Sequence, residues 1–264
     1  MNVYLMVDIE GISGIYAKEQ VLFGESRFNE GRRFMTEDIN ACMRGLKDAG
    51  VDKIYIRDCH GTSYTVLWNE VSNDADFVIS GKTGEARFAG IEDCDAAILL
   101  GYHSMAGTAG GILEHTWSSK SVQNVWMNGE KVGELAIDAG ILGDLGKPVI
   151  MVSGDDKVCA EAKSLMPNIV TAEVKKGLSS FGGMLLTPQK AHELLREKAK
   201  EAVLNYKNVK PYVVLKPVEV KIELVERGVL PRMNAHDGLE HIDGRTYKVS
   251  ADTVENAVFK AMVF

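Results

Sequence analysis

The sequence contains few cysteines, and no two of them are paired in a motif. Four cysteines occur among 264 residues, and none of them lies in a C-x-x-C pair. Small secreted domains that depend on disulfides are much richer in cysteine, so that class of protein is excluded. Reduced thiols in a cytoplasmic protein are the simplest interpretation, and we expect a cytoplasmic location.

Long hydrophobic runs are also missing. No apolar stretch is long enough to span a bilayer. The first residues, Met1 to Asp8, contain no basic residue before the first acid, whereas secretory signal peptides begin with a positively charged region. We therefore expect a protein that lies inside the cell and is not associated with a membrane.

Basic charge is not concentrated anywhere in the chain. Lysine and arginine number 30 against 37 acidic residues, which gives a formal net charge of -7. Nucleic-acid binding needs clustered Lys and Arg for phosphate contacts, so we expect no nucleic-acid partner. The hydrophobic share of 45% and the charged share of 25% are typical of soluble globular proteins. The length permits one large α/β domain or two smaller ones.

Predicted strands and helices alternate through the first part of the chain. Short apolar runs predict buried strands at residues 3–7, 53–57, 77–80, 96–101 and 148–152. Helical spacing of apolar residues predicts helices at 30–49, 133–145 and 156–164. This alternation predicts an α/β fold with a largely parallel central sheet flanked by helices.

The rest of the chain has a different pattern. Residues 121–127 alternate like a strand, and Asn128-Gly129 is a strong hairpin-turn signal. Pro188 opens a predicted helix that continues to residue 202. Strands at 213–225 and 246–249 and a helix at 253–262 complete a smaller α+β portion. We therefore expect an α/β domain over residues 1–170 and a smaller α+β domain over residues 171–264.

Carboxylate and imidazole side chains follow three of the predicted strands. Asp8 and Glu10 follow the first strand, His60 follows the second, and His103 follows the strand that ends at Gly101. In open α/β sheets, sites gather outside the carboxyl ends of the strands. Imidazole and carboxylate are the ligands of catalytic zinc, and a shared carboxylate can bridge two ions. The spacing therefore predicts a metal site, in which Asp8 could bridge two metals while Glu10 completes one of them.

Other polar residues have plain interpretations when each is taken alone. His115 follows a Gly-rich segment and is most simply structural, although beside a metal site it becomes a candidate for proton transfer or transition-state stabilisation. Glu134 is a favourable acid in a first helical turn. Asp155 and Asp156 are interpreted as a helix start. His236 and His241 lie in a polar loop, where a substrate role is the alternative to a plain surface position.

Six short motifs, in this order and spacing, resemble the D-aminopeptidase family, a zinc-dependent peptidase family often encoded in dipeptide transport operons. The resemblance extends through residues 168–175 and weakens after about Gly177. The motifs are Val7-Asp8-Ile9-Glu10-Gly11-Ile12-Ser13-Gly14, Asp58-Cys59-His60, Leu100-Gly101-Tyr102-His103, Glu114-His115, Val132-Gly133-Glu134 and Gly154-Asp155-Asp156.

The resemblance implies a metal centre with two zinc ions per subunit. Asp8 would bridge the two ions. Glu10 and His60 would bind one ion, and His103 and Glu134 would bind the other. The first of the two expected domains would then be the metal-binding catalytic one.

The resemblance also implies an activity and an assembly. His115 matches the residue that the family treats as catalytic. Members release an N-terminal D-amino acid, often D-Ala, from short peptides and amides, and they are described as ring-stacked decamers. Residues 178–183 and 225–242 differ from the family pattern; if they line the substrate pocket, the preference for D-Ala changes while the metal chemistry does not.

Two alternatives to a D-aminopeptidase remain open at this point. The first is another dinuclear metal hydrolase that acts on an amide or ester other than a D-peptide. The second is a non-catalytic peptide-binding protein of a transport operon. Loss of His115 or of a ligand residue would favour the second alternative, and all of these residues are present.

Overall fold

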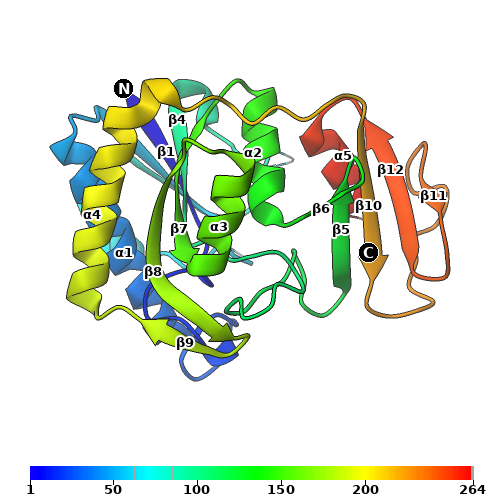
Figure 1. Cartoon of the computed structure of the whole chain (residues 1–264), viewed down its shortest axis with the longest axis horizontal. Helices are drawn as coiled ribbons and strands as arrows, with labels where there is room; N and C mark the ends of the chain where they lie inside the picture. The colour runs from blue at the N-terminus through cyan, green and yellow to red at the C-terminus, as the bar shows by residue number, and fades with distance from the viewer. Residues whose placement is uncertain (62, 85, 263–264) are drawn as a thin grey trace.

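Two sheets organise the chain in the computed structural model, which describes residues 1–61, 63–84 and 86–262 (Figure 1). A seven-stranded sheet has the order β3-β2-β1-β4-β7-β8-β9, and a five-stranded sheet has the order β11-β12-β10-β5-β6. In the first sheet, every pairing is parallel except that of β8 with β9. The predicted α/β class, with a largely parallel sheet and a smaller α+β portion, is confirmed.

The central strands of the larger sheet are buried on both faces. Along β1, Val3, Leu5 and Val7 belong to one hydrophobic core, whereas Tyr4 and Met6 belong to the other. Burial of both faces explains why β1, β4 and β7 are mostly apolar runs in the sequence. The strands are β1 (Asn2–Val7), β2 (Lys53–Asp58), β3 (Phe77–Ile79), β4 (Ala96–Leu100), β7 (Val149–Asp155), β8 (Val170–Ser179) and β9 (Gly182–Leu185).

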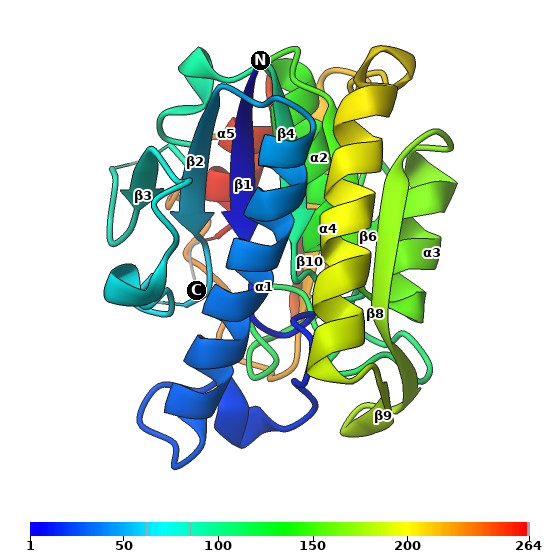
Figure 2. The same cartoon turned by 90° about the vertical axis from the view of Figure 1, so that its left-hand side faces the viewer.

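Helices cover both faces of this sheet. On one face, α1 (Phe28–Asp48) and α4 (Pro188–Asn205) lie side by side (Figure 2). On the other face lie α2 (Glu134–Asp144) and α3 (Asp156–Leu165), between the two sheets and at the front of Figure 1. The remaining helical turns are η1 (Lys18–Gln20), η2 (Trp68–Glu70), η3 (Ile91–Asp93) and η4 (Tyr206–Asn208).

The smaller sheet is antiparallel and carries the last helix, α5 (Val254–Ala261), which packs on β10 and β12. The predicted hairpin turn at Asn128-Gly129 is confirmed, because both residues have positive φ angles, 50° and 87°, as a type I′ turn requires. The strands are β5 (Val122–Met127), β6 (Glu130–Val132), β10 (Val218–Leu224), β11 (Glu240–His241) and β12 (Thr246–Ala251).

The strands of the two sheets are not separated along the chain at residue 170. The β8–β9 hairpin and α4, at 170–205, complete the larger sheet and its helical layer. The β5–β6 hairpin, at 122–132, pairs instead with β10. The expected domains over 1–170 and 171–264 therefore do not coincide with the two sheets, because the chain leaves the first sheet after β4 and returns to it through α2 and β7. The expected strand at 213–225 begins only at Val218, after Pro217, which has no N–H for the ladder.

The three central strands end at one edge of the larger sheet. β1 pairs in parallel with both β2 and β4, so the residues that follow these strands meet in space. In the part of the chain that the structure describes, no helix has the length and apolar character needed to cross a membrane.

Candidate metal centre

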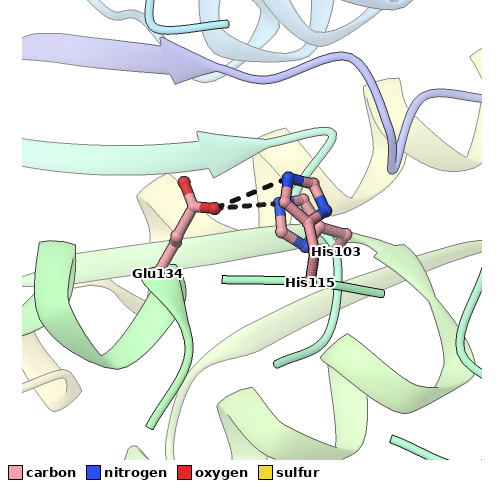
Figure 3. A group of neighbouring side chains, drawn as sticks. All are labelled: His103, His115 and Glu134. Atoms are coloured by element: carbon pink, nitrogen blue, oxygen red, sulfur yellow. Dashed lines mark ion pairs between the residues drawn. The ribbon is translucent and has the colours of Figure 1, made fainter. Parts of the chain in front are cut away.

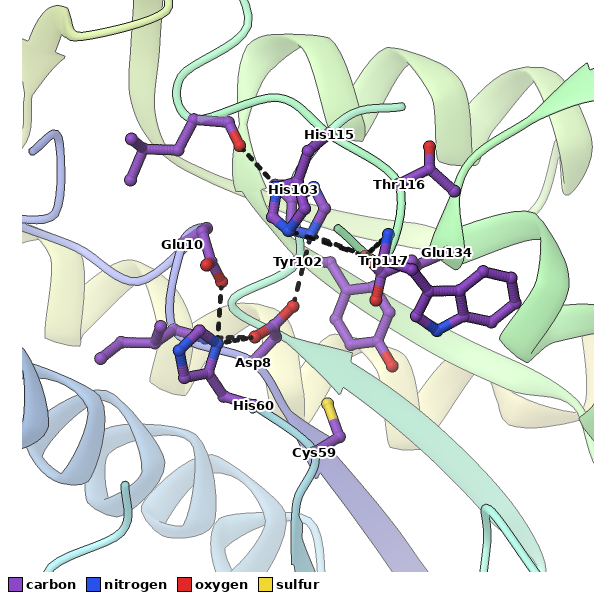
Figure 4. Close-up of polar contacts among 12 residues, drawn as sticks. Asp8, Glu10, Cys59, His60, Tyr102, His103, His115, Thr116, Trp117 and Glu134 are labelled. Atoms are coloured by element: carbon purple, nitrogen blue, oxygen red, sulfur yellow. Dashed lines mark hydrogen bonds and ion pairs between the residues drawn. The ribbon is translucent and has the colours of Figure 1, made fainter. Parts of the chain in front are cut away.

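The residues that follow β1, β2 and β4 converge around Asp8 (Figure 4). Asp8 Oδ1 lies 3.0 Å from His60 Nδ1, and Asp8 Oδ2 lies 3.5 Å from His103 Nε2. Glu10 Oε2 lies 3.2 Å from the same nitrogen of His60. Glu134, the first residue of α2, places Oε1 3.3 Å from His103 Nε2. All five expected ligands are therefore in one cluster, with Asp8 between two imidazole–carboxylate pairs.

Two glycines allow the loops that carry these ligands to touch. Gly11 N donates to Gly101 O at 2.7 Å. A Cβ atom on Gly11 would lie 1.9 Å from Tyr102 O, and one on Gly101 would lie 2.3 Å from Asp8 O. Gly101 also has a φ of 71°, which favours glycine. The glycines in these two motifs are therefore explained by the close approach of the β1 and β4 loops.

In each of three imidazoles, one ring nitrogen is hydrogen-bonded to a backbone carbonyl. His60 Nε2 lies 2.8 Å from Val21 O, His103 Nδ1 lies 3.2 Å from Ser104 O, and His115 Nδ1 lies 2.8 Å from Leu113 O. A carbonyl only accepts, so these nitrogens carry the proton and donate. The other nitrogen of each ring faces the carboxylates, which is how metal-binding histidines are usually oriented.

Unpartnered buried atoms test whether a metal fits this cluster. Asp8, Glu10, His103 and Glu134 are at most 8% exposed. Glu10 Oε2 and His103 Nε2 are buried without a hydrogen-bond partner. Buried charges are normally paired or coordinate metals, and nitrogen with carboxylate oxygen is a ligand set that zinc accepts. The donor atoms present therefore fit zinc.

The electrostatics of the cluster also favour a bound cation. Burial lowers the pKa of His103, but the carboxylates of Asp8 and Glu134 outweigh burial and hold that pKa well above its usual range. Burial raises the pKa of Asp8, but the neighbouring imidazoles of His103 and His60 hold that pKa well below its usual range. The carboxylates thus stabilise positive charge on the imidazoles. A metal ion competes with protons for the same atoms.

His115 lies directly beside this cluster (Figure 3). Its ring stacks on that of His103, with centroids 4.0 Å apart and planes inclined by 8°. His115 Nε2 lies 3.9 Å from Glu134 Oε1. Atoms of His103, His115 and Glu134 form one group within 4.8 Å, and atoms of Asp8, Glu10 and His103 form another. His115 is thus close enough either to act on a substrate or to serve as a ligand.

The segment that carries His115 is fixed at both ends. Leu113 and Trp117 have positive φ angles of 54° and 61°, which are uncommon for residues other than glycine. Leu113 N donates to Ser180 O at 2.8 Å, and Trp117 N donates to Glu134 Oε1 at 2.7 Å. These hydrogen bonds therefore stabilise the unusual backbone conformation at the two positions. The bond from Trp117 also orients Glu134, a candidate metal ligand.

The interpretation of Asp155 as a helix start is confirmed, because its Oδ1 accepts from Lys157 N and Val158 N at the beginning of α3. Its Oδ2 also accepts from Ile112 N at 2.8 Å and so anchors the loop before His115.

His241 lies in β11, with Nε2 2.8 Å from Pro231 O, and it is not among the residues around the metal cluster.

No role was predicted from the sequence for Lys175, which lies in this region. Its buried ammonium on β8 donates to the carbonyls of Glu10, Ile12 and Ile15 at 2.5, 2.9 and 2.8 Å. Burial lowers the pKa of Lys175 to about 7. A lysine within a strand gives no local sign of such a role, because its three acceptors lie at least 160 residues away. Lys175 therefore holds the loop that presents Glu10.

Arg87 is a second residue of this region for which no role was predicted from the sequence. Its guanidinium forms a bidentate pair with buried Asp138, which also accepts from Tyr102 Oη at 2.6 Å. Arg87 Nη2 lies 3.9 Å from Glu134 Oε2. Asp138 is one helical turn after Glu134 on α2, so this network supports the position of Glu134.

A cavity of about 740 Å³ opens on the metal cluster. Of the two segments expected to differ from the family pattern, 178–183 contributes Ser180 and Phe181 to its walls, whereas no residue of 225–242 lines it among those described. Further apolar side chains give the cavity a hydrophobic wall. They are Val21, Leu22, Phe23, Phe28, Leu113 and Trp117.

Comparisons with known proteins identify the family of this chain. A family model described as D-aminopeptidase matches residues 1–263. A curated D-aminopeptidase of Bacillus subtilis (strain 168) is 32% identical over 247 residues, which cover 93% of this chain and 89% of that protein. The solved structure of the Zn-dependent D-aminopeptidase DppA from Bacillus subtilis, described as a self-compartmentalizing protease, superposes with a TM-score of 0.92 at 31% identity. That match covers 100% of this chain and 96% of the other. The chain therefore belongs to the D-aminopeptidase family.

Proposed function

We propose that this protein is a zinc-dependent aminopeptidase that releases an N-terminal D-amino acid, such as D-Ala, from short peptides or amides. Family membership over nearly the whole chain supports the activity. The observation that carries the metal chemistry is the position of Asp8, whose two carboxylate oxygens each face a different imidazole. The α/β body around the larger sheet is the catalytic part of this proposal.

Two ions per subunit fit the arrangement best. Glu10 and His60 would hold one zinc, His103 and Glu134 would hold the other, and Asp8 would be shared. When bound, the two ions supply Lewis acidity and lower the pKa of water, which makes a nucleophile available near neutral pH.

The protein's own residues supply the rest of the chemistry. His115 has its Nδ1–H committed to Leu113 O, so its Nε2 is free to take up or release a proton beside the cluster. When protonated, the same nitrogen can donate to the oxyanion of a tetrahedral intermediate. The free amino group of a substrate would be recognised by Glu10, by Glu134 or by a zinc ion.

A second candidate function is hydrolysis of another amide or ester by the same centre. Ser180 and Phe181 are the reason to consider it, because they line the cavity and belong to a segment that we expect to differ from the family pattern. A change in the pocket wall alters the substrate without altering the ligands.

Paired peptides test the proposed activity. With added zinc at neutral pH, we expect D-Ala-D-Ala to be cleaved, and L-Ala-L-Ala and N-acetyl-D-Ala-D-Ala to be poor substrates, because the pocket must recognise both a D-residue and a free amine. A chelator should abolish turnover, and re-added zinc should restore it. Preference for the L-peptide, or equal cleavage of the acetylated peptide, would favour the second candidate instead.

We also propose that the protein assembles into a homo-oligomer, specifically a decamer. The support is the similarity to a protease described as self-compartmentalizing. Exposed apolar side chains on the β8–β9 hairpin that do not line the cavity, Leu178 and Met184, suit burial against a partner. Light scattering should give a mass about ten times the 28.9 kDa of one chain; a monodisperse monomer would contradict the assembly.

A further inference from the structure

Three side-chain cations line the cavity that opens on the metal cluster: Lys18, Arg87 and Lys120. Arg87 is already paired with Asp138. Lys18 and Lys120 have no carboxylate within ion-pair distance among the described residues. The lysines that do form ion pairs with side chains there are Lys157, Lys198, Lys216 and Lys248. Two cations of the cavity are therefore available to a ligand.

The cavity is electrically polarised. Its carboxylates at Asp8, Glu10 and Glu134 are buried, whereas Lys18 and Lys120 are exposed. The acidic groups thus lie deep, and the free cations lie on the solvent side. Lys18 Nζ is placed 5.0 Å above the ring of Phe181, another wall residue, and such a cation–π contact keeps the ammonium over the cavity wall.

A short peptide with free ends carries the complementary charges. The following step rests on the proposed function, which places the ammonium group and the scissile carbonyl of the substrate at the acidic metal cluster. The carboxylate of a dipeptide then lies about one residue beyond the scissile bond, or roughly 3.5 Å further along the chain. A lysine ammonium is a point charge on a flexible stem, so it can follow a carboxylate over such small differences in length.

We propose that Lys18 and Lys120 form a subsite for the C-terminal carboxylate of the substrate, so that short peptides with a free C-terminus are preferred over the same peptides with an amidated C-terminus. This subsite acts on substrate selection, and the metal centre does not depend on it.

The test compares D-Ala-D-Ala with D-Ala-D-Ala amide, which present the same scissile bond. Both are assayed with the zinc-loaded wild type, Lys18→Met, Lys120→Met and the double variant. Exposed ion pairs are individually weak and screened by salt, so we expect each single variant to lose about three-fold in kcat/KM on the free acid. We expect the double variant to lose about ten-fold, mainly through KM. On the amide, every variant should stay within about two-fold of the wild type.

A matched control and added salt sharpen the result. Lys207→Met removes an exposed lysine that does not line this cavity and should change neither substrate. Raising the ionic strength should reduce the wild-type preference for the free acid. Equal losses on both peptides, or a wild type that does not distinguish them, would overturn the subsite while leaving the D-aminopeptidase activity intact. Cleavage of neither peptide would reject the proposed function, and the subsite with it.

Discussion

Replacing Asp8 with alanine is expected to remove both zinc ions and abolish hydrolysis. Its two carboxylate oxygens face His60 and His103, which belong to different pairs in the cluster, so neither ion would keep its full set of ligands. We expect the loss of turnover to be at least as large as the ~10²–10⁴-fold effect of removing a general acid–base group. Elemental analysis and kcat/KM measured on the same preparation check both parts.

Single-site ligand variants separate a shared carboxylate from an ordinary one. Glu10→Ala should weaken one ion more than the other, and Glu134→Ala should do the reverse. Glu37→Ala, which removes an exposed carboxylate on α1, should keep two ions and full activity. An Asp8→Ala protein that still bound one ion as tightly as the wild type would show that Asp8 is not shared.

His115→Ala is expected to retain its zinc but to lose about 10²–10⁴-fold in turnover. The ring stacks on His103 and its Nδ1 donates to Leu113 O, so Nε2 faces the cluster without a hydrogen-bond commitment. The effect should fall on kcat more than on KM, because a proton-transfer group acts in the transition state.

The control for this variant is His236→Ala, which removes a histidine that does not line the cavity. It should leave both zinc content and turnover unchanged. The zinc content of His115→Ala distinguishes a catalytic role from a role as a metal ligand. If zinc content fell in proportion to activity in His115→Ala, the residue would be a ligand together with His103 and Glu134.

The strand-end ligands were predictable from the sequence for a physical reason. Buried parallel strands appear as apolar runs, and the carboxyl ends of neighbouring strands share an edge. Asp8, His60 and His103 follow three strands that are adjacent in the sheet. Their proximity therefore follows from local patterns and one general rule of topology.

Glu134 and His115 were not predictable in this way. Glu134 begins α2 after a hairpin that belongs to the other sheet, and His115 lies in an irregular loop. Their place beside the cluster depends on the return of the chain to the first sheet, which no local pattern encodes. Resemblance to a family supplied these residues, and their roles remain predictions.

The expected domain boundary at residue 170 falls at the start of β8, a strand that was not predicted from the sequence. Charged residues at Glu173, Lys175 and Lys176 interrupt its apolar pattern, so no strand was predicted at 170–179. Lys175 is nevertheless buried, because its ammonium binds three carbonyls of the β1 loop. The position of β8 in the sheet thus involves a polar contact between distant segments. The apolar pattern from which we predict strands does not reveal such a contact.

Anomalous scattering at the zinc edge, from crystals of the zinc-loaded protein, tests the central claim most directly. The proposed centre predicts two peaks per chain, roughly 3.5–4 Å apart as in other two-metal sites. One should lie between Asp8, Glu10 and His60, and the other between Asp8, His103 and Glu134. A single peak held by His103, His115 and Glu134, whose donor atoms also lie within 4.8 Å of one another, would contradict the shared-carboxylate centre and the catalytic role of His115 together.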